Sequence, residues 1–319
     1  MNILAFESSC DETAVAVVRD GRQVLSDAIL SQADMHALYG GVVPEIASRK
    51  HVEAIAGLTD QALRDAGLTK RDVDAVAVTY APGLIGAVLV GVSFAKSAAW
   101  ALNVPLVPVH HVRGHIAANY LAFPELEPPF LALAISGGNT LIVDVADYTD
   151  MRVLGLPYPG GKPMDLLAQQ SSGGMYPLPR AHVEGAALDM SFSGLKTAVV
   201  NLVHNAQQKN EPLDAAALAR DFTQAVSDEL TERAALALAQ TGRRVLVAAG
   251  GVAANSFIRA DLQTLCRRQG VTLYLPPLKW CGDNGAMIGA QGYYEYLAGV
   301  RGDMTLNGYA TMELDGVTF

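Results

Sequence analysis

The N-terminal region alternates between apolar runs and short polar breaks, the pattern of a three-stranded meander. Residues 2–7 and 13–18 are apolar and flank the polar sequence S-S-C-D-E at 8–12. Asp20-Gly21 is a strong turn signal, and residues 23–30 can form a third strand. An acidic loop is therefore expected at the first bend of this meander.

A strand–helix–strand unit is predicted next. Residues 73–79 alternate like a strand and lead through A-P-G-L-I-G at 81–86 into a long helix of small residues at about 87–102. Residues 104–109 form the following strand, and a further helix is expected from about His111. This order of elements predicts a βαβ unit that ends on H-H-V-R-G-H.

The opening pattern then occurs a second time. Residues 130–135 and 140–145 are apolar strands joined by the small polar bend S-G-G-N at 136–139. This arrangement repeats that of residues 2–18, so an internal duplication is expected.

The remaining elements are less evenly spaced. Residues 151–192 are interrupted by many prolines and glycines, and they are expected to be irregular with one short helix near 164–170. The elements expected after them are helices at 194–207 and 214–240, a strand at 245–249, a helix from about 254, a strand at 271–275 and a last helix to about 297.

The length of 319 residues favours two domains, because a single core rarely grows that large. We expect an α/β protein with a duplicated two-domain fold. The first domain would span residues 1–110, and the helix near 282–298 would pack back on it. The second would span 111–319 and carry the irregular insert at 151–192.

Composition narrows the class of protein. The formal charge of −9 argues against generic binding to nucleic-acid phosphates. Three cysteines without C-x-x-C spacing fit a reducing cytosol. No uninterrupted apolar run reaches membrane-spanning length, and the N-terminus lacks the basic start of a signal peptide. We therefore expect a cytoplasmic protein with no membrane association.

A candidate metal site involves three residues. His111 and His115 are four apart, so on a helix they stand on one face, one turn from each other. Asp283 follows an apolar strand in a Gly-flanked turn that opens a helix, where α/β sites commonly form. Two histidines and one carboxylate suit Fe or Zn. The alternatives are two surface histidines and an ordinary helix N-cap.

A zinc protease is the first enzyme class to consider for such a pair. The H-E-x-x-H signature places a glutamate beside the first histidine as general base. Val112 stands at that position. The protease hypothesis therefore lacks its base.

Two glycine pairs indicate a nucleotide site. Gly137-Gly138 and Gly250-Gly251 can bring backbone N–H groups close to phosphate or ribose, or can simply allow tight bends. Together with the duplicated meander they resemble the nucleotide cleft of the actin-like and sugar-kinase fold. Asn255 would either contact a ribose or cap a helix. Asp11 and Glu12 in the first bend would face the cleft, with ordinary turn acidity as the alternative.

Nine ordered motifs resemble one family almost from end to end. The family is that of the tRNA N6-adenosine threonylcarbamoyltransferases (TsaD), formerly described as O-sialoglycoprotein endopeptidases. The motifs are E-S-S-C-D-E-T-A at 7–14, Y-G-G-V-V-P-E-I-A-S-R-K-H at 39–51, A-P-G-L-I-G-A-V-L-V-G at 81–91, H-H-V-R-G-H at 110–115, S-G-G-N-T at 136–140, Y-P-G-G at 158–161, S-F-S-G-L-K-T-A at 191–198, G-G-V-A-A-N at 250–255 and D-N-G-A-M-I-G at 283–289.

The resemblance implies a two-domain actin-like fold with a nucleotide cleft between the domains. It implies transfer of a threonylcarbamoyl group from threonylcarbamoyl-AMP to N6 of adenosine 37 in tRNAs reading ANN codons. The implied partners are tRNA, a TsaB-like paralogue and a TsaE-like ATPase, and the implied cofactor is one divalent metal, Fe²⁺ favoured and Zn²⁺ possible.

The resemblance also implies roles for individual residues. The metal ligands would be His111, His115 and Asp283. Asp11 would act as general base or orient the attacking amine, with Glu12 in support. The residues implied to hold the adenylate are Ala134, Ile135, Ser136, Gly137, Gly138, Gly161, Asp165 and Asn255.

One departure from the family pattern affects the adenylate site. After Leu154 the family carries a further segment of the type D-D-A-x-G-E-x-x-D-K, whose last aspartate contacts the adenylate, and it is absent here. This absence motivates a third hypothesis, a non-catalytic scaffold of the modification complex, beside the transferase and the metal-dependent glycoprotease.

Overall fold

The computed structural model describes residues 1–135, 140–154, 165, 168–179, 187–190 and 192–315. The chain forms two compact units. Unit 1 comprises 1–128, 147–151 and 282–319, and unit 2 comprises 129–146 and 152–281. The boundary expected after residue 110 falls inside unit 1, because the helix that follows packs against the last helix of the chain.

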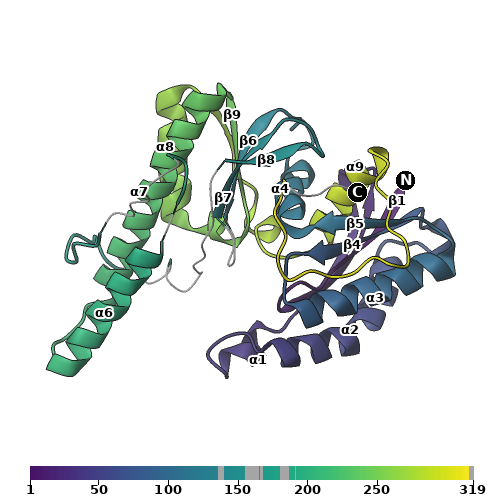
Figure 1. Cartoon of the computed structure of the whole chain (residues 1–319), viewed down its shortest axis with the longest axis horizontal. Coiled ribbons are helices and arrows are strands. Elements are labelled where there is room, and N and C mark those ends of the chain that lie inside the picture. The colour runs from purple at the N-terminus through teal and green to yellow at the C-terminus, as the bar shows by residue number, and fades with distance from the viewer. Residues whose placement is uncertain (136–139, 155–164, 166–167, 180–186, 191, 316–319) are drawn as a thin grey trace. The chain divides into compact units, whose positions relative to one another are not determined.

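Unit 1 contains a five-stranded sheet in the order β3-β2-β1-β4-β5, of which β1, β4 and β5 are labelled in Figure 1. The three N-terminal strands are the predicted antiparallel meander, and β4 and β5 extend it in parallel. The strands are β1 (Asn2–Glu7), β2 (Glu12–Arg19), β3 (Gln23–Ser31), β4 (Ala75–Ala81) and β5 (Leu106–His110).

Helices cover both faces of this sheet. Phe6 and Val78 belong to the core that α2 and α3 bury on one face. The helices of the unit are α1 (Ala33–Ala37), α2 (Pro44–Asp65), α3 (Ile85–Leu102), α4 (His111–Ala122) and α9 (Gly285–Leu297), with a short 3₁₀ turn at Lys70–Asp72. Among the described residues, α3 alone is long and apolar enough to cross a membrane, and it packs against β4 and α2 with 33% of its residues buried.

Three glycines let α9 lie directly on the sheet. A Cβ added at Gly285, Gly289 or Gly292 would come within 2.6–2.7 Å of an atom of Ala16, Val18 or Ala77. Their spacing of four and three residues places them on one side of the helix. Close packing of α9 therefore depends on the absence of side chains along this line, and it fixes the start of α9 relative to the strands.

Replacing Gly289 with alanine is expected to lower the free energy of unfolding by about 1–3 kcal/mol, because the new methyl group would overlap Val18. Gly57 in α2 is the matched control, since a Cβ there meets nothing within 4 Å. Gly57→Ala is expected to raise stability by about 0.5–1 kcal/mol through helix propensity. Denaturant titration of both variants measures the two effects, and equal signs would contradict the packing argument.

Unit 2 contains a second five-stranded sheet, in the order β10-β9-β6-β7-β8. β6 and β7 are antiparallel, whereas β6, β9 and β10 run parallel. The strands are β6 (Phe130–Ile135), β7 (Thr140–Val145), β8 (Met151–Val153), β9 (Val245–Ala249) and β10 (Thr272–Tyr274). The helices are α6 (Ser193–Lys209), α7 (Ala215–Thr241) and α8 (Ser256–Gln269), with 3₁₀ turns at Gly251–Ala254 and Leu278–Trp280.

The two sheets share one topology. In each, an antiparallel hairpin is extended on its first strand by two parallel strands, so β6, β7, β9 and β10 correspond to β1, β2, β4 and β5. The duplication expected from residues 2–18 and 130–145 is therefore present in the order of the strands.

Candidate metal centre

The candidate metal site lies in unit 1 and is formed by one helix and one turn. His111 is the first residue of α4, directly after β5, and His115 follows one turn later. Asp283 belongs to the turn that precedes α9. One ligand atom from each of the three residues lies within 4.8 Å of the others. The structure thus brings together the three residues that the sequence singled out.

The distances suit a common metal ion. Asp283 Oδ1 is 3.5 Å from His111 Nε2 and 3.2 Å from His115 Nε2. Two ligand atoms at tetrahedral positions about 2.0–2.1 Å from a zinc ion are about 3.3 Å apart. Both observed distances are close to that separation.

His115 supplies a second test of the site. Its side chain is 2% exposed, Nδ1 has no hydrogen-bond partner among the described residues, and Nε2 has only the contact of 3.2 Å with Asp283 Oδ1, which lacks hydrogen-bond geometry. A buried imidazole with so few partners is uncommon in native proteins, because an unsatisfied polar group is costly. A metal ion beside Nε2 would satisfy that nitrogen, so the residues present fit the ion.

The charges of the site are strongly coupled. Burial alone would lower the pKa of His111, but the charges of Asp283 and Glu7 outweigh it and raise the pKa to about 9. Burial would raise the pKa of Asp283, but the charge of His111 and the contact with His115 lower it to about 2. Without a metal, a protonated His111 therefore neutralises part of the buried negative charge.

The metal-free chain is expected to lose stability as the pH rises from about 6.5 to about 9. The folded pKa of His111 lies above its ordinary value of 6.5, so the stabilisation is complete below pH 6.5 and disappears through pH 9. Thermal unfolding in the presence of a chelator measures this. His111→Gln is expected to remove most of that pH dependence, and an unchanged profile would contradict the assignment.

Local hydrogen bonds hold Asp283 in place. Asn284 is fully buried and caps α9, accepting a bond from the Met287 backbone N–H at 2.8 Å and donating to the Gly282 carbonyl at 2.8 Å. The backbone N–H of Gly285 donates to Asp27 on β3 at 3.1 Å. The turn is therefore fixed on both sides of Asp283.

The acidic loop at the first bend lies near the metal site. Burial, together with the charges of Asp283 and Asp11, raises the pKa of Glu12 to about 8. Glu12 Oε1 accepts a hydrogen bond from Ser31 Oγ at 2.9 Å. His51 on α2 binds the Cys10 carbonyl through Nε2 at 3.0 Å and so holds the loop.

Unit 2 places other predicted residues at one end of α8. Asn255 accepts bonds from the Phe257 and Ile258 backbone N–H groups, both at 3.1 Å, so it caps the helix. Asp165 accepts bonds from the backbone N–H and the hydroxyl of Ser256 at 3.1 and 2.9 Å. Both side chains therefore contact the positive end of the helix, where anions bind readily.

Most of the other residues predicted to hold the adenylate lie at the end of β6 or follow it directly in the sequence. Ala134 and Ile135 are buried there, and Ala134 is paired with Ala249 of β9 just before Gly250. Gly250 has a φ of 84°, which favours glycine. Ser136, Gly137, Gly138 and Gly161 lie outside the described residues.

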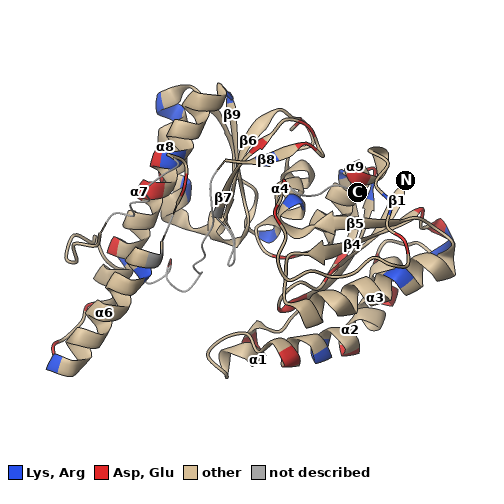
Figure 2. Cartoon of the chain, in the orientation of Figure 1, with Lys and Arg blue, Asp and Glu red and all other residues tan. Residues whose placement is uncertain are grey.

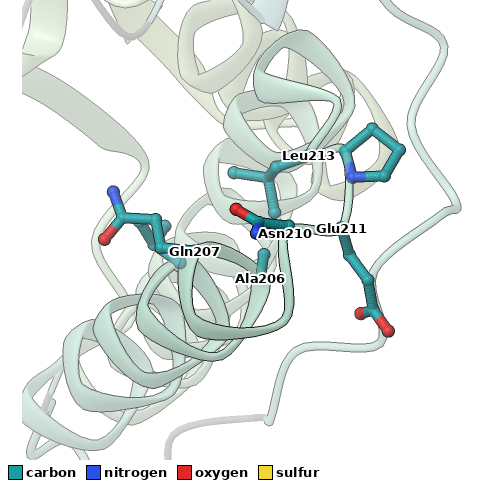
Figure 3. A pocket seen from close by; sticks show the side chains of 7 residues that line it. Ala206, Gln207, Asn210, Glu211 and Leu213 are labelled. Atoms are coloured by element: carbon teal, nitrogen blue, oxygen red, sulfur yellow. The ribbon is translucent and has the colours of Figure 1, made fainter.

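A hollow in unit 2 lies at the turn between α6 and α7 (Figure 3). It has a volume of about 410 Å³ and is lined by Val203, Ala206, Gln207, Asn210, Glu211, Pro212 and Leu213. Glu211 is the one ionisable group in this lining, and its carboxylate points away from Ala206 in the figure. The hollow has no second ligand or nucleophile, so it is not a candidate active site.

Glu7, the last residue of β1, contacts the site although its sequence context does not indicate this. Its Oε2 is 3.1 Å from His111 Nδ1, on the side of the ring opposite Nε2. The available signal was a glutamate at the end of an apolar strand, which by itself does not indicate a histidine partner.

The fold defines an α/β protein of the actin-like and sugar-kinase class, and unit 1 carries a candidate metal site. Solved structures of the same fold include HypF from T. kodakarensis, with a TM-score of 0.63, 14% identity and coverage of 93% of this chain and 48% of that one. The ROK hexokinase of Thermus thermophilus has a TM-score of 0.52 and 19% identity, covering 93% and 99%.

Sequence relatives identify the family within this class. A model of TsaD, tRNA N6-adenosine threonylcarbamoyltransferase, matches residues 23–290. Proteins of that name from Moorella thermoacetica and Clostridioides difficile are 46% and 43% identical, covering 98% of this chain and 97% and 98% of theirs. The chain belongs to the TsaD family. It is accordingly a transferase with a role in tRNA modification.

The alignments also bear on chain length. The match to the Moorella thermoacetica relative extends over 333 positions, whereas this chain has 319 residues in all. At least 14 aligned positions therefore have no counterpart here. A deletion of this size agrees with the absence of the segment that the family carries after Leu154. Leu154 is the last described residue before 155–164.

Proposed function

We propose that this chain transfers the threonylcarbamoyl group from threonylcarbamoyl-AMP to N6 of adenosine 37 in tRNAs reading ANN codons, with release of AMP. The observation that carries the proposal is the cluster of buried His111 and His115 with the partly exposed Asp283, whose ligand atoms lie within 4.8 Å of one another, in a chain of the TsaD family. Fe²⁺ is the proposed ion and Zn²⁺ the second candidate, since two histidines and a carboxylate suit both.

The proposed chemistry places modest demands on the protein. The adenine amine attacks the carbamoyl carbon, a C–N bond forms, the bond to the phosphate oxygen breaks, and the amine loses a proton. A metal ion held by His111, His115 and Asp283 would supply positive charge for an oxygen that becomes negative during transfer. The chain must otherwise align the two reactants, which can contribute several kcal/mol.

Unit 2 is proposed to hold the adenylate. The supporting feature is the N-terminus of α8, where the capping residue Asn255 and the neighbouring Asp165 lie together. The backbone from Ala134 to Gly138, together with Gly161, completes the proposed set. The first N–H groups of α8 already donate to Asn255 and Asp165, so these two side chains are proposed to contact the ribose, whereas the backbone N–H groups of the glycines suit the phosphate.

Asp11 and Glu12 are proposed to receive the proton of the amine or to orient it. The pKa of Glu12 near 8, raised by burial and by the charges of Asp283 and Asp11, supports a role in proton transfer around neutral pH. His51 would act on the same loop by holding the Cys10 carbonyl.

Partner proteins are proposed to assist this chain. Its formal charge of −9 argues against generic binding to the phosphates of the tRNA by this chain alone. Along α2, acidic and basic residues alternate (Figure 2). A TsaB-like paralogue is one proposed partner. A TsaE-like ATPase and a cytoplasmic location complete this proposal.

Reconstitution tests the proposal against both alternatives. The chain is combined with the partner proteins, threonine, bicarbonate, ATP and unmodified tRNA, and modified adenosine is measured by mass spectrometry. We expect modification that His111→Ala reduces by at least ~10²-fold. Modification with the wild-type chain excludes a pure scaffold. If tRNA binds but is not modified, the transferase proposal fails and the missing segment becomes the first explanation to test.

The glycoprotease alternative has its own measurement. The metal-loaded chain is incubated with a glycoprotein, and cleavage is followed by electrophoresis. No cleavage is expected, because Val112 stands where a zinc protease carries its general base. Cleavage that disappears in His111→Ala would favour the protease.

A further inference from the structure

Glu7 is a buried carboxylate whose contacts point to a specific task. Its side chain is fully buried at the end of β1. Oε1 accepts a hydrogen bond from the Ser9 backbone N–H at 2.5 Å, and Oε2 accepts one from Thr79 Oγ1 at 2.5 Å. Oε2 is also 3.1 Å from His111 Nδ1. Both oxygens are therefore occupied by donors.

These contacts favour the ionised form of Glu7. The Ser9 backbone N–H can only donate, so Oε1 accepts, and Oε2 faces two further groups that can donate, the Thr79 hydroxyl and His111 Nδ1. An ionised carboxylate can only accept hydrogen bonds. The His111 nitrogen that faces it must therefore carry a proton.

The contact with Ser9 does not by itself determine which ring nitrogen of His111 carries the proton. Its hydroxyl oxygen is 3.1 Å from the same Nδ1 atom. A hydroxyl can donate as well as accept, so Ser9 alone would tolerate either tautomer. If Nδ1 accepted the serine proton, neutral imidazole would carry its hydrogen on Nε2, and Nε2 could not bind a metal.

We propose that Glu7 is the positioning residue that keeps the proton of His111 on Nδ1, so that Nε2 faces Asp283 as a metal ligand. The proposal rests on the metal site proposed above. Carboxylate–histidine–metal arrangements of this type orient the ring and raise its basicity as a ligand. His115 has no comparable partner among the described residues, so the two histidines are held by different means.

Glu7→Gln is the informative substitution because it keeps the shape and removes an acceptor. The glutamine oxygen is needed by the Ser9 N–H, which can only donate. The amide NH₂ would then face Thr79 and His111, and it would donate to Nδ1. The proton of His111 would move to Nε2, against metal binding.

Zinc affinity of the purified full-length chain is the measured quantity, obtained by competition with a chromophoric chelator. Glu7→Gln is expected to weaken zinc binding by about 10–100-fold. Ser9→Ala is the matched control on the same nitrogen, and it is expected to change affinity by less than about threefold. An equal loss in both variants, or none in Glu7→Gln, overturns the assignment of Glu7.

His111→Ala separates this inference from the proposed function. If zinc binds the wild type and His111→Ala equally, the metal site itself is wrong. If His111→Ala loses zinc while Glu7→Gln binds like the wild type, only the role of Glu7 fails.

A spectroscopic readout keeps the inference testable if Glu7→Gln does not fold. ¹⁵N NMR of the zinc-loaded wild-type chain, labelled at histidine, reports which ring nitrogen of His111 carries hydrogen. The expected result is a protonated Nδ1 and a metal-bound Nε2. A hydrogen on Nε2 overturns the proposal.

Discussion

Glu295→Ala is expected to lower the free energy of unfolding by about 3–5 kcal/mol, because it would leave a buried charge without a partner. Arg113 Nη1 is 2.9 Å from Glu295 Oε1, and the two side chains are 5% and 2% exposed. Gln291 also donates to Oε1 at 2.9 Å. The pair joins α4, which carries the histidines, to α9, which follows Asp283.

Denaturant unfolding of Glu295→Ala measures this effect, with Glu53→Ala as the control. Glu53 pairs with Lys50 at 2.7 Å, but its side chain is 62% exposed. Removing a surface pair of this kind is expected to cost less than about 1 kcal/mol. The double variant Arg113→Met with Glu295→Leu is expected to recover part of the loss. Equal costs at the two glutamates would contradict the burial argument.

Asp283→Asn is expected to reduce zinc or iron binding and to lower transfer activity by at least ~10²-fold. The substitution keeps the size of the side chain but removes the charge that lies between His111 and His115. Asn284 still caps α9, so the fold is expected to persist. Metal analysis and the reconstituted transfer assay measure the two losses.

Asp60→Asn is the control for Asp283→Asn, since Asp60 is exposed and lies 3.9 Å from Lys70. It is expected to leave metal content and transfer unchanged. Full metal content in Asp283→Asn would show that the carboxylate is not a ligand. Loss of metal with full activity would show that the ion does not take part in transfer.

Hydrophobic periodicity was sufficient for most of the fold. The strands expected at 130–135 and 140–145 have the same bounds in the structure, because short polar bends mark their ends clearly. The five-residue helix α1 and the three-residue strand β8 were not expected. Elements this short bury too few side chains to produce a recognisable period.

The candidate site could be predicted only where the signal comes from residues that are close together in the sequence. The four-residue spacing in α4 indicated the histidine pair, whereas Asp283 was indicated by a Gly-flanked turn between an apolar strand and a helix. Asn255 was left open between ribose contact and helix cap, and the structure shows the cap. Glu7 could not be found from sequence, because its partners Thr79 and His111 are 72 and 104 residues away.

The late position of α9 has a consequence for the order of events during synthesis. The face of the first sheet that α9 covers includes Ala16, Val18 and Ala77, all made long before residue 285. A growing chain therefore leaves this apolar face bare while the whole of unit 2 is translated. Nascent chains in that state are prone to aggregate. Asp283, the third of the proposed metal ligands, is also made only then, so the proposed site would be complete only near the end of translation.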